Sequence, residues 1–265
     1  MMTEANSFNL GSIESQYQRD GYVKISDGFD GIELREVVSV VSRFHNCWKQ
    51  ENGKTLLKGA VNSSYLTGTQ YLSDLDRSAL FWFISSSKIA RIISELPFQR
   101  AAFMNAQLFF DPVDAKRKNY WHRDPQYHLS IDEQKKVLSG SEVIHIRIPL
   151  RNEPGIELIP GTHRRWDSEE ELKVRLEQSG KKNHHDISTG VVVPLSKGDA
   201  LVFSANIIHR GLYGNDRRSF DLLFCEAKPE LAQFLRRDCL PDRSILSSLE
   251  NPLWFQNAID LKGRD

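Results

Sequence analysis

The sequence has few cysteines, no excess of charge of either sign and no long hydrophobic run. Its three cysteines, Cys47, Cys225 and Cys239, form no Cys-x-x-Cys pair, so we expect reduced thiols and neither a disulfide framework nor a zinc-ribbon site. Lys plus Arg and Asp plus Glu are 35 each, so the chain has no surplus of basic residues for nucleic-acid binding. No apolar run approaches the roughly 18 residues of a membrane span. Nucleic-acid and membrane partners are therefore not expected.

The length and composition predict one globular unit. The chain has 265 residues, of which 40% are hydrophobic and 26% charged, enough to bury a sizeable core without covalent cross-links. Residues 1–6 lack the basic and apolar segments of a signal peptide, so we expect a cytoplasmic protein. We expect a single domain over residues 1–265, and the sequence predicts no oligomeric state.

The first hundred residues predict a helical layer, about 12–98. A short helix within residues 12–27 leads through Gly21 into the strand Tyr22–Ile25. Residues 32–50 and 76–97 have apolar side chains at helical spacing, the second as two short helices before Pro97.

Residues 99–228 predict a mainly β core. Short segments rich in Val, Ile and Phe follow one another without helical spacers, which favours a sandwich or barrel over a doubly wound sheet. An insertion that begins with a short helix at Ser168 and continues as a polar stretch to about 188 is predicted as a lid, and 229–265 as a C-terminal tail. The predicted strands are Ala101–Phe110, Val143–Leu150, Ile156–Ile159, Gly190–Pro194, Ala200–Ser204 and Ser219–Glu226.

Two separated segments together predict a metal site. His122 and Asp124 lie two residues apart and share one face if they are on a strand. His209 ends an apolar segment and is followed by Gly211, where loops expose sites. Two histidines and one carboxylate leave open coordination positions, as in non-haem Fe(II) oxygenases. Alone, His-x-Asp is a weak signal.

At this point the chain resembles the phytanoyl-CoA dioxygenase-like branch of the Fe(II)- and 2-oxoglutarate-dependent oxygenases. Four segments carry the resemblance, in the family's order: residues 17–23, the Trp-His-Arg-Asp motif 121–124, the Ile-Pro-Gly-Thr-His segment within 157–164, and 198–219. The ordered set is far more specific than any member.

The resemblance implies a double-stranded β-helix (jelly-roll, cupin-like) core with Fe(II) on His122, Asp124 and His209. It also implies 2-oxoglutarate and O2 as co-substrates, with release of succinate and CO2. Because relatives that halogenate replace the carboxylate with a small residue, the presence of Asp124 favours hydroxylation.

An arginine near the second histidine is expected to bind the far carboxylate of 2-oxoglutarate. Arg218 lies nine residues after His209 and shares its strand face with Phe220; Arg217 would share its face with Ser219 and Asp221. Because burial of an unpaired Asp221 is costly, we favour Arg218 over Arg217.

Other polar residues, Ser219 among them, are further candidates for the co-substrate site. Asn105 and Gln107 alternate on the strand before the metal motif, and Arg147 lies opposite an apolar set on its strand, like His145. Each has a purely structural alternative, as solvent-exposed or edge-strand groups. Arg123, Arg147, Arg164 and Arg165 also offer contacts for an anionic substrate.

The sequence therefore predicts an oxygenase that acts on a small-molecule substrate. Two alternatives stay open: a jelly-roll protein that binds a metal or ligand without turnover, because fold does not determine function, and an oxygenase that acts on a macromolecule.

Overall fold

The computed structural model describes residues 10–263; residues 1–6, considered above for a signal peptide, lie outside the described residues. Within them, antiparallel strands form a six-stranded sheet in the order β1-β7-β4-β9-β3-β2 and a three-stranded sheet in the order β6-β5-β8. The strands are β1 (Tyr22–Ile25), β2 (Asn62–Ser63), β3 (Ala101–Phe110), β4 (Val143–Pro149), β5 (Glu153–Leu158), β6 (Val191–Leu195), β7 (Ala200–Ser204), β8 (His209–Gly211) and β9 (Arg218–Glu226).

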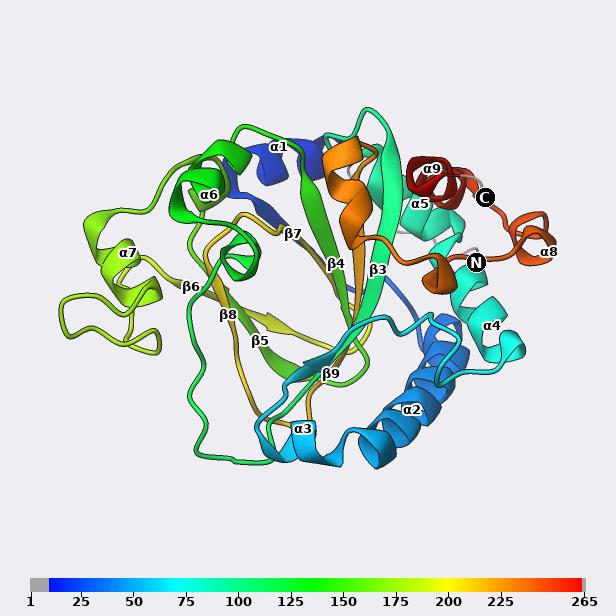
Figure 1. The fold of residues 1–265 in the computed structure, drawn as a ribbon, viewed down its shortest axis with the longest axis horizontal. Coiled ribbons are helices and arrows are strands. Elements are labelled where there is room, and N and C mark those ends of the chain that lie inside the picture. The colour runs from blue at the N-terminus through cyan, green and yellow to red at the C-terminus, as the bar shows by residue number, and fades with distance from the viewer. Residues whose placement is uncertain (1–9, 264–265) are drawn as a thin grey trace, which may run out of the picture.

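Helices cover the outer face of the large sheet, and the two sheets face each other across the interior (Figure 1). The α-helices are α1 (Leu10–Asp20), α2 (Glu33–Glu51), α3 (Gly53–Leu57), α4 (Asp74–Ile84), α5 (Ser87–Ser94), α6 (Ile131–Val137), α7 (Glu169–Arg175), α8 (Arg243–Leu246) and α9 (Leu253–Lys262). Short 3₁₀ helices are η1 (Asp124–Tyr127), η2 (Thr162–Arg164), η3 (Pro229–Phe234) and η4 (Arg237–Cys239).

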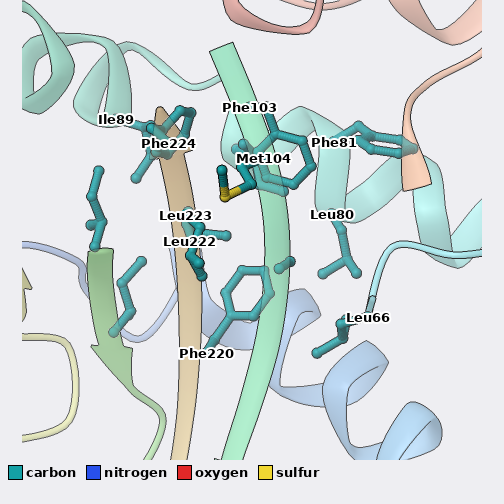
Figure 2. Close-up of a cluster of buried hydrophobic side chains, with 14 of the residues drawn as sticks. Leu66, Leu80, Phe81, Ile89, Phe103, Met104, Phe220, Leu222, Leu223 and Phe224 are labelled. Carbon is teal, nitrogen blue, oxygen red and sulfur yellow. The ribbon is translucent and has the colours of Figure 1, made fainter. Parts of the chain in front are cut away.

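The main hydrophobic core lies between the large sheet and helices α1, α2, α4, α5, α8 and α9. Figure 2 shows Phe220, Leu222 and Phe224 of β9 beside Phe103 of β3 and Phe81 of α4. Since side chains alternate along a strand, the residues between these apolar ones face the other sheet. The sequence pattern of β4 and β9, apolar at every second position, thus places polar groups inside the jelly roll.

A second, smaller core closes the space between the sheets at one end. It joins Ile156 and Leu158 of β5 to Leu201 and Phe203 of β7. The turn before β7 contains Gly198, which has φ +91° and lies so close to the main chain of Phe29 that a Cβ would clash. The predicted jelly-roll fold is confirmed.

The carboxyl-terminal residues are not the tail that we expected. Trp254, Phe255 and Ala258 of α9 are buried in the main core, and α9 packs on β3. The 3₁₀ helix η3 reaches the cavity described below. From the sequence, we had assigned no packing to residues 229–265.

None of the described residues of the insertion, which we expected as a lid, lines the cavity described below. Val174 of α7 and Ile187 pack against Trp121 and Ile208 in a separate apolar cluster, and α7 lies at the left edge of Figure 1 beside α6. Trp121 is adjacent in sequence to His122 but lies in the core, so the insertion anchors this loop from behind. Within the part of the chain that the structure describes, no helix is both long and apolar enough to cross a membrane.

Candidate active site

The two histidines of the predicted metal site lie opposite each other in a β-bridge. The main chains of His122 and His209 exchange two hydrogen bonds of 2.9 Å, and their rings are 4.2 Å apart between centroids. We considered His122 and Asp124 on one strand, but Asp124 begins η1 instead. The carboxylate nevertheless approaches both rings: one potential ligand atom from each of the three residues lies within 4.8 Å of the others.

The hydrogen bonds of the His122 and His209 rings use Nδ1 and leave Nε2 of each ring for a metal. Nδ1 of His122 lies 3.2 Å from the carbonyl oxygen of Tyr120, and Nδ1 of His209 lies 3.0 Å from that of Ile207. Each Nδ1–H can therefore donate to the main chain, and each Nε2 faces Oδ1 of Asp124, at 3.5 and 3.7 Å. Burial, with a smaller effect of His122, lowers the pKa of His209 to about 3 and keeps it neutral, the form that binds metals. The three residues fit a metal with two imidazole ligands and one carboxylate ligand.

A network of buried charged residues holds the second carboxylate oxygen of Asp124 by hydrogen bonds. Nε2 of His145 donates to Oδ2 of Asp124 at 2.7 Å, and Nδ1 of His145 lies 3.1 Å from Asp221. Arg147 donates to Asp221 through Nε at 3.0 Å and Nη2 at 2.8 Å. Burial lowers the pKa of His145, but the two carboxylates outweigh burial and raise it to about 9, so this imidazole donates from both nitrogens.

The pairing of Asp221 in this network explains which arginine faces the interior. Asp221 is fully buried but paired, so its burial does not prevent Arg217, Ser219 and Asp221 from facing inward. Our choice of Arg218 was wrong in this respect. Arg218 shares its face with Phe220, as expected, but this face packs on the helical layer, where Nη1 lies 3.5 Å from Ser42.

Arg217 lines the cavity and has an unused donor. Its side chain is 1% exposed; Nη2 donates to the carbonyl of Phe110 at 2.9 Å, whereas Nε is buried without a hydrogen-bond partner. The guanidinium lies over the ring of Tyr213, at 5.2 Å from its centroid, and the nearest oxygen of Asp111 is 4.0 Å from Nε. A buried cation with an unpaired N–H fits a site for a carboxylate.

A cavity of about 600 Å³ joins these groups. Its lining includes the three predicted ligands and Arg217, together with Asn105, Gln107, His145 and Arg147. Ser219 is beside the cavity instead, where its hydroxyl donates to Glu153. His128 also lines it.

From the sequence, we did not single out several further lining residues. Tyr120, Tyr127, Tyr213, Leu231 and Phe234 contribute to the wall. The tyrosines lie near the His-x-Asp and His209 segments and were detectable by that proximity. Nothing in the sequence signals Leu231 or Phe234, which follow the last strand.

A comparison with known families agrees with this geometry. The model of the family described as phytanoyl-CoA dioxygenase (PhyH) matches residues 17–218. The chain belongs to this family. The resemblance noted from the motifs is therefore confirmed, and the Fe(II)- and 2-oxoglutarate-dependent class of chemistry follows from the family together with the His122–Asp124–His209 group. A search of curated proteins gives no match in sequence.

Solved structures share the fold at low identity. AviO1 from Streptomyces viridochromogenes Tue57 is 17% identical, with a TM-score of 0.57 over 84% of this chain and 97% of its own. EctD from S. alaskensis, in its apoform, is 14% identical, with a TM-score of 0.56 over 86% and 80% of the two chains. The epimerase SnoN, in complex with Fe3+, alpha ketoglutarate and nogalamycin RO, is 17% identical, with a TM-score of 0.52 over 82% and 84%. The relatives include an epimerase and a carbocyclase, so the fold alone does not specify the reaction.

Proposed function

We propose that this protein is an Fe(II)- and 2-oxoglutarate-dependent oxygenase that hydroxylates a C–H bond of a small molecule. One observation carries the proposal: the His122–Asp124–His209 group lies in the wall of a cavity that is also lined by Arg217, a buried cation whose Nε has no hydrogen-bond partner. A metal and a dicarboxylate co-substrate are the ligands for which these two features are suited. SnoN and EctD, which have this fold, were crystallised with alpha ketoglutarate and 2-oxoglutarate respectively.

Each residue has a defined role in this proposal. His122, Asp124 and His209 hold the metal, and Arg217 pairs with the far carboxylate of 2-oxoglutarate. His145 occupies Oδ2 of Asp124 and so leaves Oδ1 for the metal. Asn105 and Gln107 are available to hydrogen-bond the co-substrate or the substrate from β3. When bound, the iron would supply O2 activation coupled to decarboxylation of 2-oxoglutarate; the protein supplies orientation and exclusion of water.

The test is production of succinate. Purified protein with Fe(II), 2-oxoglutarate and O2 should form succinate, and His122→Ala and Asp124→Ala should reduce it to background while circular dichroism shows an intact fold. His184→Ala is the matched control, since this histidine is exposed. Wild-type rates in the His122 or Asp124 variants would refute the ligand assignment. Tight metal binding without succinate would support the alternative of a non-catalytic jelly-roll protein.

A further inference from the structure

The register of the large sheet orders the chemistry of the cavity wall. On β4, Arg147 pairs with Asp221 of β9, His145 pairs with Leu223, and Val143 follows at the next inward position. Successive residues on one face of a strand are about 7 Å apart, so the wall changes from charged to apolar within roughly 14 Å. Arg217 marks the charged end, just before β9, and His145 marks the level of the metal ligands through its contact with Asp124.

The far half of the cavity is apolar and comes from several segments. Its walls include Leu129, Val137, Val143, Leu223, Leu231 and Phe234. Main-chain and side-chain contacts bring these segments together beyond His145. The N–H of Ala205 donates to the carbonyl of Val143 at 2.9 Å, and Nδ2 of Asn206 donates to the carbonyl of Val137 at 3.2 Å.

No charge in this half is free to bind a charged substrate. Among the lining residues that the structure describes, the acidic and basic side chains other than histidine are Asp124, Arg147 and Arg217, all in the metal and co-substrate half. Next to the apolar half, Glu230 accepts from Ser141, and Arg236, over the ring of Tyr65, is paired with Asp238 at 2.6 Å.

The arginines that suggested an anionic substrate in the sequence are engaged elsewhere. Arg123 is 1% exposed and bound to Asp167, Arg165 is paired with Glu171, and Arg147 with Asp221. Among the described lining residues, neither Arg164 nor Arg165 appears. A carboxylate or phosphate in the apolar half would thus be desolvated without a partner, which is strongly unfavourable.

We propose that the substrate is a neutral, largely apolar molecule that has no carboxylate, phosphate or coenzyme A group inside the cavity. The side-chain oxygen of Asn206 and the ring of His128 remain to hydrogen-bond a polar group of such a molecule, for example a hydroxyl. The inference rests on the proposed function, since it takes the cavity to be the substrate site.

Binding of matched ligands tests this class directly. The protein is loaded with Fe(II) and 2-oxoglutarate under nitrogen, which prevents turnover, and titrated with the neutral fluorescent probe N-phenyl-1-naphthylamine. The probe is then displaced with 1-decanol, decanoate or decylamine, which differ in the charge of one end. We expect 1-decanol to compete at least about tenfold better than either ion. Equal or better competition by decanoate would overturn the proposal.

A variant of the cavity wall tests whether these ligands bind in this cavity. Leu231→Lys adds a cation to the apolar half and should weaken 1-decanol and strengthen decanoate, each by about tenfold or more. Leu75→Lys, at a position that is 73% exposed and outside the cavity, is the matched control and should change neither. Equal effects of the two variants would show that the ligands bind elsewhere and would refute the assignment.

The succinate assay separates the two proposals. Succinate formation combined with a preference for decanoate would refute the substrate class alone. No succinate combined with a preference for 1-decanol would refute the proposed function, and with it the assignment of this ligand as a substrate.

Discussion

Replacement of Arg217 should damage the use of 2-oxoglutarate far more than replacement of Arg218. Arg217 is buried in the cavity wall with Nε unpaired, whereas Arg218 contacts Ser42 on the helical side of β9. The two arginines are adjacent in sequence and carry the same charge. Their comparison therefore isolates the direction in which the side chain points.

The expected change in KM follows from the buried pair that Arg217 would form with the far carboxylate of 2-oxoglutarate. A hydrogen bond to a charged group contributes about 1.5–3 kcal/mol, and a difference of 1.4 kcal/mol is about tenfold in binding. Arg217→Ala should therefore raise the apparent KM for 2-oxoglutarate by about 10- to 150-fold. Arg218→Ala should change it by less than about twofold. Arg217→Lys should restore part of the loss, because a lysine keeps the charge but not the fork of donors.

The assay measures succinate or CO2 against the concentration of the oxo acid, with thermal unfolding as a check on the fold. A second co-substrate, 2-oxopentanoate, has a methyl group where 2-oxoglutarate has its far carboxylate. The wild type should strongly prefer 2-oxoglutarate, and Arg217→Ala should abolish most of this preference. If Arg217→Ala keeps the preference, or if Arg218→Ala has the larger effect, Arg217 is not the carboxylate partner.

Three further predictions test the support of the site and the packing of the fold. Arg123 lies between His122 and Asp124, and its guanidinium makes several hydrogen bonds that a lysine cannot replace. Arg123→Lys should therefore weaken Fe(II) binding by about 10-fold or more in anaerobic calorimetry. Unchanged affinity would contradict this positioning role. Burial lowers the pKa of His45 and of His163 to about 4, so the unfolded chain takes up these protons first as the pH falls below about 6.5. The free energy of unfolding should thus fall by up to about 3 kcal/mol per histidine between pH 6.5 and 4. Denaturant titrations of His163→Gln should show a smaller fall than those of the wild type. An equal dependence on pH in the two proteins would argue against this role of His163. Phe255→Ala in α9 should destabilise the protein by about 3–5 kcal/mol, whereas Leu253→Ala, at a position that is 67% exposed, should cost little, and equal midpoints in urea would show that α9 is dispensable.

The sequence predicted best what depends on local pattern. The strand Ala101–Phe110 was predicted with its observed bounds, and alternation along β4 correctly separated Ile146 from His145 and Arg147. The His-x-Asp spacing and His209 found the three residues that the structure brings together, although Asp124 begins a 3₁₀ helix.

What the sequence did not predict depends on partners that are distant in the chain. The choice between Arg217 and Arg218 rested on the cost of burying Asp221, and the compensating groups, His145 and Arg147, come from another strand. The apolar spacing in the insertion gave no direction, so its packing behind Trp121 was not foreseen. Cavity residues after the last strand, such as Phe234, follow no motif.

The two halves of the cavity share β4 and the β9 segment but differ in the other segments that line them. The charged half draws on Arg147 of β4 and on Arg217 just before β9, with Asp124 at the start of η1 and His209 of β8. Besides Val143 of β4 and Leu223 of β9, the apolar half uses Leu129 and Val137 from the connection before β4, and Leu231 and Phe234 from η3 after β9. Substitutions in these connecting segments can change which molecule is accepted without disturbing the proposed co-substrate site. Selection can therefore act on substrate choice and on oxygen chemistry separately, which makes this scaffold open to acquiring new substrates.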